Sequence, residues 1–246
     1  MDPLTLGLLC AAFALAAALY GSVGHGGASA YLAIMALFSL TSDVMRPTAL
    51  TLNILVAGFG AWRFIRAGRF AWPVFWPIAL GAAPFAFLGG SLQLPTDAYR
   101  PLLGIVLFLA GLRLAWPDRG PRSGATKPPA PLAAVGAGAG IGLLAGLTGT
   151  GGGIFLSPML IFLRWTSAEA TTGIAASFIV LNSFAGLAGN VAAMGALPAF
   201  LPLLALAVIF GGVVGVWLGI ARFSTTLLRR ALALVMFIAG VKLVFT

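Results

Sequence analysis

The sequence predicts an all-α, polytopic membrane protein, and three observations support this fold class. Hydrophobic residues make up 61% of the chain and charged residues only 8%, whereas soluble domains carry roughly a quarter charged residues. Apolar segments of helical length follow one another along the whole chain, as they do in proteins that cross a bilayer several times. A glycine-rich turn occurs twice, which indicates two related halves.

Ten apolar segments, bounded by glycine, proline or charged residues, are the expected helices. They cover residues 4–21, 27–40, 44–65, 70–92 and 98–116, and then 132–148, 153–164, 168–194, 198–221 and 225–245. No cleavable-signal pattern sets the first segment apart, so we expect it to be a retained span. Residues 117–131 are rich in proline, glycine and charge, which is typical of an exposed linker. We therefore expect a first membrane repeat at 1–116, a cytoplasmic linker at 117–131 and a second repeat at 132–246.

The two halves match at several places. The run GSVGHGGAS begins at Gly21 and the run GLTGTGGG begins at Gly146, so four glycines coincide at an offset of 125 residues. The run LAGLRL at 109–114 aligns with IAGVKL at 238–243 at an offset of 129. At that second offset Asn53 aligns with Asn182. A tandem duplication of about 120 residues explains these matches.

The distribution of Lys and Arg predicts the topology, because cytoplasmic loops retain these residues. With the first two segments of each half counted as a pair that crosses twice or re-enters, eleven basic residues share one side and three the other. The smaller set is Arg46, Arg100 and Lys242. This arrangement puts both termini outside and makes the repeats inverted, about an axis in the membrane plane. The same scattered placement argues against nucleic-acid binding, despite a net charge of +9.

The segments 27–40 and 153–164 begin at the glycine turns, and they are short. Their apolar cores reach only roughly 20 Å, less than the roughly 30 Å of the hydrocarbon layer. We therefore expect two helical hairpins that enter from opposite faces, with their glycine tips near the bilayer middle. Residue counting leaves ten full crossings open as the alternative.

Each glycine turn is a candidate anion site. Successive glycine N–H groups can form an anion-binding nest, and the N-terminus of the following helix adds a partial positive charge. The preceding helix presents carbonyl groups at the same turn, so the dipoles alone do not exclude a cation. All five acidic residues lie at segment ends or in loops, so no carboxylate is available to hold a cation, and an anion fits better. The alternative is that the glycines only allow close helix packing.

Polar side chains in the apolar segments extend this candidate site. Asn53 and Asn182 lie near the middle of corresponding segments, each on a stripe of small residues that should face protein. Their amides could donate to oxyanion oxygens or bond across helices, and both readings stay open. Thr48, Thr51 and Ser177 are weaker candidates, because such hydroxyls commonly bond back to the preceding turn.

His25 is the only histidine and stands where the second turn has Thr150. It could titrate near neutral pH and couple protons to transport, or it could cap the next helix. A single histidine and the single cysteine, Cys10, predict no metal site and no disulfide. Cys10 is expected to be a small core residue. Arg63 and Arg66 could concentrate anions in an inner vestibule, but anchoring at the membrane surface is the simpler account.

The paired motifs GSVGHGGAS and GLTGTGGGIFLSPML resemble the repeated glycine motif of the TauE/SafE family of sulfite and organosulfonate exporters, also called the 4-toluene sulfonate uptake permease family. The resemblance extends to the duplicated halves, the charged central loop and the GLRL-type end of each half. It implies a bacterial inner-membrane carrier of sulfite, sulfoacetate, thiosulfate or a related anion. This sequence departs from internal symmetry at His25 and at Ala33, where the second half has Pro158.

We therefore expect a secondary transporter, acting by alternating access, rather than an enzyme, because no P-loop, HExxH or GxSxG pattern is present. No cofactor is expected. The expected partners are a small anion, the lipid bilayer and a proton as candidate coupling ion; a homodimer stays open. A passive anion channel and a membrane scaffold for an enzyme are the alternatives. The candidate binding residues are Gly24, His25, Gly26, Gly27, Asn53, Gly149, Thr150, Gly151, Gly152, Gly153 and Asn182.

Overall fold

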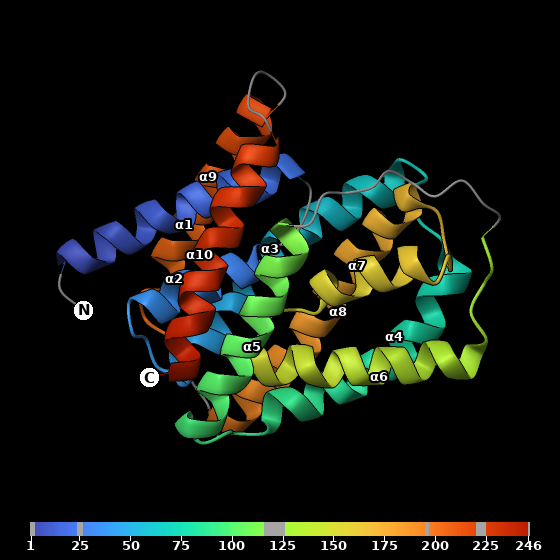
Figure 1. Cartoon of the computed structure of the whole chain (residues 1–246), viewed down its shortest axis with the longest axis horizontal. Coiled ribbons are helices and arrows are strands. Elements are labelled where there is room, and N and C mark those ends of the chain that lie inside the picture. The colour runs from blue at the N-terminus through green and yellow to red at the C-terminus, as the bar shows by residue number, and fades with distance from the viewer. Residues whose placement is uncertain (1–2, 24–26, 116–125, 195–196, 220–224, 246) are drawn as a thin grey trace.

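The computed structural model describes residues 3–23, 27–115, 126–194, 197–219 and 225–245, and these residues are organised as ten α-helices without a strand (Figure 1). The helices of the first half are α1 (Pro3–Val23), α2 (Ala28–Leu37), α3 (Ser42–Arg66), α4 (Trp72–Ser91) and α5 (Thr96–Ala115). Those of the second half are α6 (Pro131–Thr148), α7 (Gly153–Phe162), α8 (Ala168–Met194), α9 (Leu201–Gly219) and α10 (Thr225–Phe245). Each predicted segment coincides with one helix, so the all-α prediction is confirmed.

Five of these helices are long and apolar enough to cross a membrane: α3, α4, α5, α6 and α8. In contrast, α2 and α7 have 10 residues each, and their length of roughly 15 Å is about half of a hydrocarbon layer. Large apolar side chains are exposed along several helices, among them Leu80 on α4 and Phe210 on α9. Such side chains suit contact with lipid, and the protein is a polytopic membrane protein.

Small residues allow α4 and α6 to pack with their backbones in contact. Gly138, Gly142 and Gly146 on α6 face the backbone of Ile78, Ala82 and Ala86 on α4, respectively. Because the residue numbers rise together on both helices, α4 and α6 run parallel. A side chain at any of these glycines would collide with the α4 backbone. Close approach of this kind, through small residues, is common between membrane helices. The helices α1 and α9 form a matching packed pair.

Helices that correspond in the two halves pack against each other and run antiparallel. Gly60 on α3 lies beside Ala176 on α8, and Gly186 on α8 lies beside Leu50 on α3. The same holds for α5 and α10, where Gly104 lies beside Gly240 and Gly111 lies beside Ala233. Matching helices therefore make part of the contacts between the halves, beside the α4–α6 and α1–α9 pairs.

The two helices that precede the glycine turns point in opposite directions. In Figure 1, α1 starts beside the N-terminus at the left, whereas α6 starts at the right edge and ends near the middle of the molecule. The amide of Lys127, just before α6, donates to the carbonyl of Arg164, just after α7, at 2.8 Å. The start of α6 and the end of α7 therefore lie together, so the α6–α7 pair leaves and returns to the same end of the molecule.

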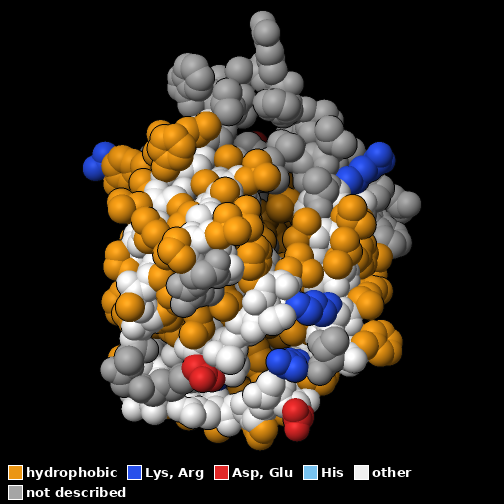
Figure 2. Space-filling model, turned by 90° about the vertical axis from the view of Figure 1, so that its left-hand side faces the viewer, with side chains coloured by type: hydrophobic (Ala, Val, Ile, Leu, Met, Phe, Trp, Pro, Cys, Tyr) orange, Lys and Arg blue, Asp and Glu red, His pale blue; other side chains and the backbone are white. Residues whose placement is uncertain are grey.

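Two apolar clusters make up the described core. The first joins α1, α2, α3, α5, α9 and α10, and the second joins α4, α6, α7 and α8. Cys10 packs partly buried against the first cluster, which agrees with its expected role as a small core residue. Figure 2 shows the face at the left of Figure 1, where apolar side chains cover most of the described surface and the acidic ones gather in its lower part.

Candidate functional site

The turn between α6 and α7 breaks a helical path with three left-handed glycines. Gly149 ends α6 with φ +82°, and Gly151 and Gly152 follow with φ +72° and +78°. Other residues rarely adopt this backbone conformation. The cluster of glycines therefore has a conformational cause, which a motif for helix packing alone does not require.

The turn is buried and leaves backbone donors without acceptors. Gly149 donates to the carbonyl of Ala145 at 2.8 Å and so closes α6. In the described part of the chain, the amides of Thr150, Gly151, Gly152 and Gly153 donate no hydrogen bond, although all four residues are buried. Buried backbone donors are nearly always paired. This group of free N–H donors at the N-terminus of α7 suits a negatively charged or oxygen-bearing ligand.

Side chains from α3 and α8 approach the turn at Gly151. A Cβ atom placed on Gly151 would lie 2.6 Å from the amide nitrogen Nδ2 of Asn53 and 3.1 Å from the hydroxyl of Ser183. Asn53 and Ser183 are both fully buried, and neither side chain has a hydrogen-bond partner among the described residues. An unpaired polar group in such a place costs roughly 1–3 kcal/mol. The turn, Asn53 and Ser183 therefore form a polar centre whose hydrogen bonds are unfilled.

Arg46 borders the same turn from α3. Its Cα would lie 3.2 Å from a Cβ atom on Gly149, and its side chain is only 3% exposed. The guanidinium donates to the carbonyls of Gly89, Gly90 and Leu92 at the end of α4 and of Gly146 near the end of α6, at 2.8–3.1 Å. Its Nε atom is buried without a partner. Arg46 is thus a buried cation held by carbonyl groups of two helix C-termini.

Hydroxyl groups fix the end of α6. Tyr99 on α5 donates to the carbonyl of Thr148 at 3.2 Å. The hydroxyl of Thr148 donates to Leu144 and lies 3.0 Å from the hydroxyl of Thr150. The carbonyls of Leu144 and Thr148 near the end of α6 therefore accept hydrogen bonds, and Thr150 is held in the buried turn.

The structure brings some of the predicted site residues together. Asn53 meets the turn of Gly149, Thr150, Gly151, Gly152 and Gly153. Asn182 is adjacent to Ser183 on α8, is fully buried, and has no partner for its amide in the described residues. Gly27 caps the N-terminus of α2. Gly24, His25 and Gly26 lie outside the described residues.

Sequence reasoning missed Arg46 and Ser183. Arg46 was counted only as a charge on the outer side, but it lies inside α3 and is buried. An arginine placed directly before Pro47, four residues into an apolar helix, is a signal that could have drawn attention to it. Ser183 directly follows Asn182 in the sequence, and its position opposite Asn53 depends on the antiparallel register of α3 and α8.

The weaker candidates from the sequence differ in the contacts that their side chains make. Thr51 donates to the carbonyl of Pro47 at 2.8 Å, which is the expected bond to the preceding turn. Thr48 and Ser177 have hydroxyls without a partner among the described residues. Arg66 is exposed and lies 4.6 Å from the ring centre of Trp62, a contact typical of an arginine anchored at a membrane surface.

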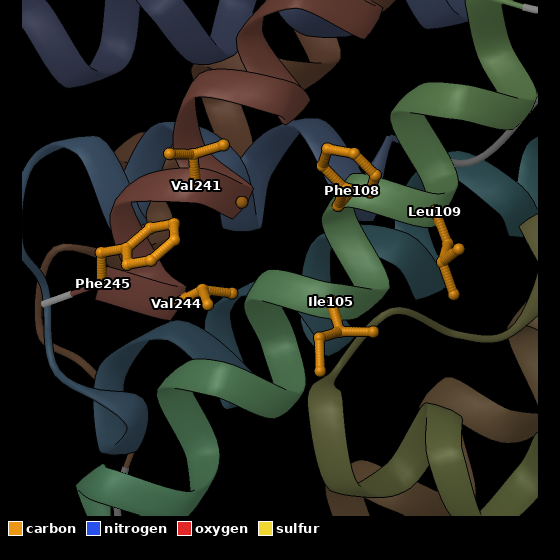
Figure 3. Close-up of a pocket in the computed structure, with 7 residues that line it drawn as sticks. Ile105, Phe108, Leu109, Val241, Val244 and Phe245 are labelled. Carbon is orange, nitrogen blue, oxygen red and sulfur yellow. The ribbon is translucent and has the colours of Figure 1, made fainter.

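A separate pocket of about 240 Å³ lies between α5 and α10. Figure 3 shows its lining, with Ile105, Phe108 and Leu109 from α5 and Val241, Val244 and Phe245 from α10. These side chains offer no polar group to an anion. Within the described residues no group of three His, Cys, Asp or Glu side chains could hold a metal ion.

Comparisons with known proteins agree with the glycine-rich architecture. The family model described as Sulfite exporter TauE/SafE matches residues 9–243. The chain is 38% identical over 250 residues, covering 100% of both chains, to the protein named "Probable membrane transporter protein y4hK" from Sinorhizobium fredii (strain NBRC 101917 / NGR234). No solved structure matches. With its duplicated glycine turns, its all-helical membrane fold and a match over nearly its whole length, the chain belongs to the TauE/SafE family of membrane transporters.

Proposed function

We propose that this chain is a secondary transporter that exports a small sulfur-containing oxyanion or an organosulfonate, such as sulfite, sulfoacetate or thiosulfate. The family description names sulfite export, and the relative from Sinorhizobium fredii is named as a probable membrane transporter. The observation that carries the proposal is the buried turn at Gly149–Gly153: its amides at 150–153 have no acceptor among the described residues, and they lie beside the amide of Asn53, which has no partner there either.

The chemistry of this turn favours an oxyanion. It offers backbone N–H donors, the Nδ2 group of Asn53 and the hydroxyl of Ser183, and each can donate to an oxygen. The acidic residues of the helices, Asp43, Asp97 and Glu169, lie in the first turns of α3, α5 and α8. A sulfite or sulfonate group presents three oxygens, which several converging donors can bind without a charged partner in direct contact.

Alternating access between two inverted repeats is the proposed mechanism. The antiparallel packing of α3 with α8 and of α5 with α10 supports it, because an axis in the membrane plane reverses the direction of a helix. The opposite directions of α1 and α6 in Figure 1 support it as well. In this mechanism the repeats are 1–116 and 132–246, joined by the linker 117–131, and the broken helices rock against the others to expose the site to either side.

The proposed location is the bacterial inner membrane, with both termini in the periplasm. His25, in the first turn, is the proposed proton-coupling group. Together with Gly24, Gly26 and Gly27 of the first repeat and Asn182 of the second, it would complete the binding region. These assignments rest on the sequence repeat and the Lys and Arg distribution.

Counterflow in proteoliposomes tests this function. Purified protein is reconstituted with unlabelled sulfite inside, and the uptake of external ³⁵S-labelled sulfite is followed with and without sulfonate competitors. A carrier gives saturable uptake that internal substrate accelerates. Uptake that neither saturates nor responds to internal sulfite would instead indicate a passive channel for small anions, and transport of another solute without any sulfite or sulfonate binding would refute the substrate class.

A further inference from the structure

A helix that is broken inside a membrane offers two opposite electrostatic ends at the break. At the α6–α7 turn, α6 ends with carbonyl groups and α7 begins with N–H groups that have no acceptor among the described residues. Each end carries about half a unit of charge, negative at the carbonyl end and positive at the amide end. Such a break can therefore hold a cation at one end or an anion at the other, unless another group occupies one of them.

Arg46 occupies the carbonyl end. It binds Gly146 on α6 together with Gly89, Gly90 and Leu92 at the end of the parallel helix α4. Its full positive charge offsets the partial negative charges of both helix ends. Because Arg46 is 3% exposed, water screens this charge weakly. The amide end of α7 then remains as the open end of the break.

The first half of the chain supplies this charge and the second half does not repeat it. At the offset of 129 that relates Asn53 to Asn182, the residue that corresponds to Arg46 is Ala175. Ala175 is a buried alanine on α8. The position in the second half that corresponds to Arg46 therefore carries no charge.

We propose that Arg46 is the residue that makes the α6–α7 turn selective for anions, by neutralising the carbonyl ends of α6 and α4 beside the bound solute. This inference rests on the proposed function and assigns the charge selectivity of that site. Arg46 acts as a positioning and selectivity residue, since its Nη atoms already bind carbonyl groups. Without it, the negative helix ends next to Gly149 would repel the solute.

A charge series of competitors tests this role in the full-length protein. Taurine, methanesulfonate and sulfoacetate share a sulfonate group and carry no net charge, one negative charge and two negative charges, respectively. Their half-inhibitory concentrations in sulfite counterflow are compared for the wild type, Arg46→Gln, Arg46→Lys and Tyr99→Phe. Tyr99→Phe is the matched control, because it removes a hydrogen bond to Thr148 at the same helix end without changing any charge.

In the wild type, sulfoacetate is expected to inhibit at a lower concentration than taurine. For Arg46→Gln we expect the half-inhibitory concentration of taurine divided by that of sulfoacetate to fall by about tenfold or more, which corresponds to about 1.4 kcal/mol. Methanesulfonate should fall between them. Arg46→Lys should keep the wild-type order of the three half-inhibitory concentrations. Tyr99→Phe should change all three half-inhibitory concentrations by the same factor. If Arg46→Gln weakens inhibition by all three compounds equally, the inference is overturned and Arg46 has only a structural role.

The outcomes separate this inference from the proposed function. A wild type that moves no sulfite refutes the function, whereas a wild type that moves sulfite with an unchanged charge series in Arg46→Gln refutes only the role of Arg46. If Arg46→Gln does not fold, Arg46→Lys decides, because its charge is retained while its fork-shaped contacts are lost. Loss of the charge order in a folded Arg46→Lys protein would then contradict the inference.

Discussion

At the scale of single residues, the proposed function rests on positions where the backbone and the side chains leave hydrogen bonds unfilled among the described residues. Gly151 has a left-handed backbone conformation, and the side chains of Asn53 and Ser183 lie close to it. Asn53 keeps a buried amide that has no hydrogen-bond partner in the part of the chain that the structure describes. A protein tolerates such costs where a ligand supplies the missing partner, so both residues make distinct predictions.

Gly151→Val is expected to abolish transport and leave membrane insertion intact. The valine would be strained at φ +72° and its Cβ would lie 2.6 Å from Nδ2 of Asn53, so it would fill the proposed anion site. Counterflow and the yield of monodisperse protein are measured together. Gly140→Val is the matched control, because a Cβ atom at Gly140 on α6 meets nothing within 4 Å. Normal transport by Gly151→Val would reduce the turn to a packing device.

Asn53→Leu is expected to abolish transport while the melting temperature in detergent stays the same or rises. Burying an unpaired amide costs roughly 1–3 kcal/mol, and an apolar side chain of similar size removes that cost. Loss of both transport and thermal stability would show that Asn53 holds the helices together. In that case its assignment to the anion site would be wrong.

At the scale of helices, the length and apolar character of the segments were enough to predict all ten elements. The glycine turns were also predictable, because clustered glycines cannot continue a helix. The role of Arg46 was not, since its partners lie 43 to 100 residues away along the chain. Those contacts exist only because α4 and α6 run parallel and end side by side. The position of Asn53 opposite Ser183 at Gly151 likewise depends on the register of α3 against α8.

The parallel pair α4 and α6 makes a prediction of its own. Gly142→Val places a side chain against the backbone of Ala82, and separating two helices that pack this closely should cost about 3 kcal/mol or more. The expected result is a large loss of folded protein in fluorescence size-exclusion chromatography. Gly136→Val on the same helix is the control, because a Cβ atom at Gly136 meets nothing within 4 Å. Equal yields of the two variants would contradict the described packing.

At the scale of the whole molecule, the two halves are expected to face the membrane in opposite orientations. The matching helices α3 and α8 run antiparallel, and the Lys and Arg distribution assigns the sides. The loops of one repeat should therefore lie on the opposite side of the membrane from the corresponding loops of the other.

Cysteine labelling in cells checks this orientation. Cys10→Ala removes the single cysteine, and Gly68→Cys or Leu197→Cys is then added in corresponding loops after α3 and after α8. A membrane-impermeant maleimide should label Leu197→Cys in intact cells and Gly68→Cys only after permeabilisation. Labelling of both from the same side would refute the inverted arrangement.

The most direct measurement of the central claim is the position of a bound oxyanion. Selenite, the selenium analogue of sulfite, gives an anomalous signal in crystals of the full chain. A selenium peak is expected within hydrogen-bonding reach of the amides of Gly151–Gly153 and of Nδ2 of Asn53. A selenium peak at another place and none at this turn, in a protein that still transports sulfite, would contradict the assignment of the turn as the binding site.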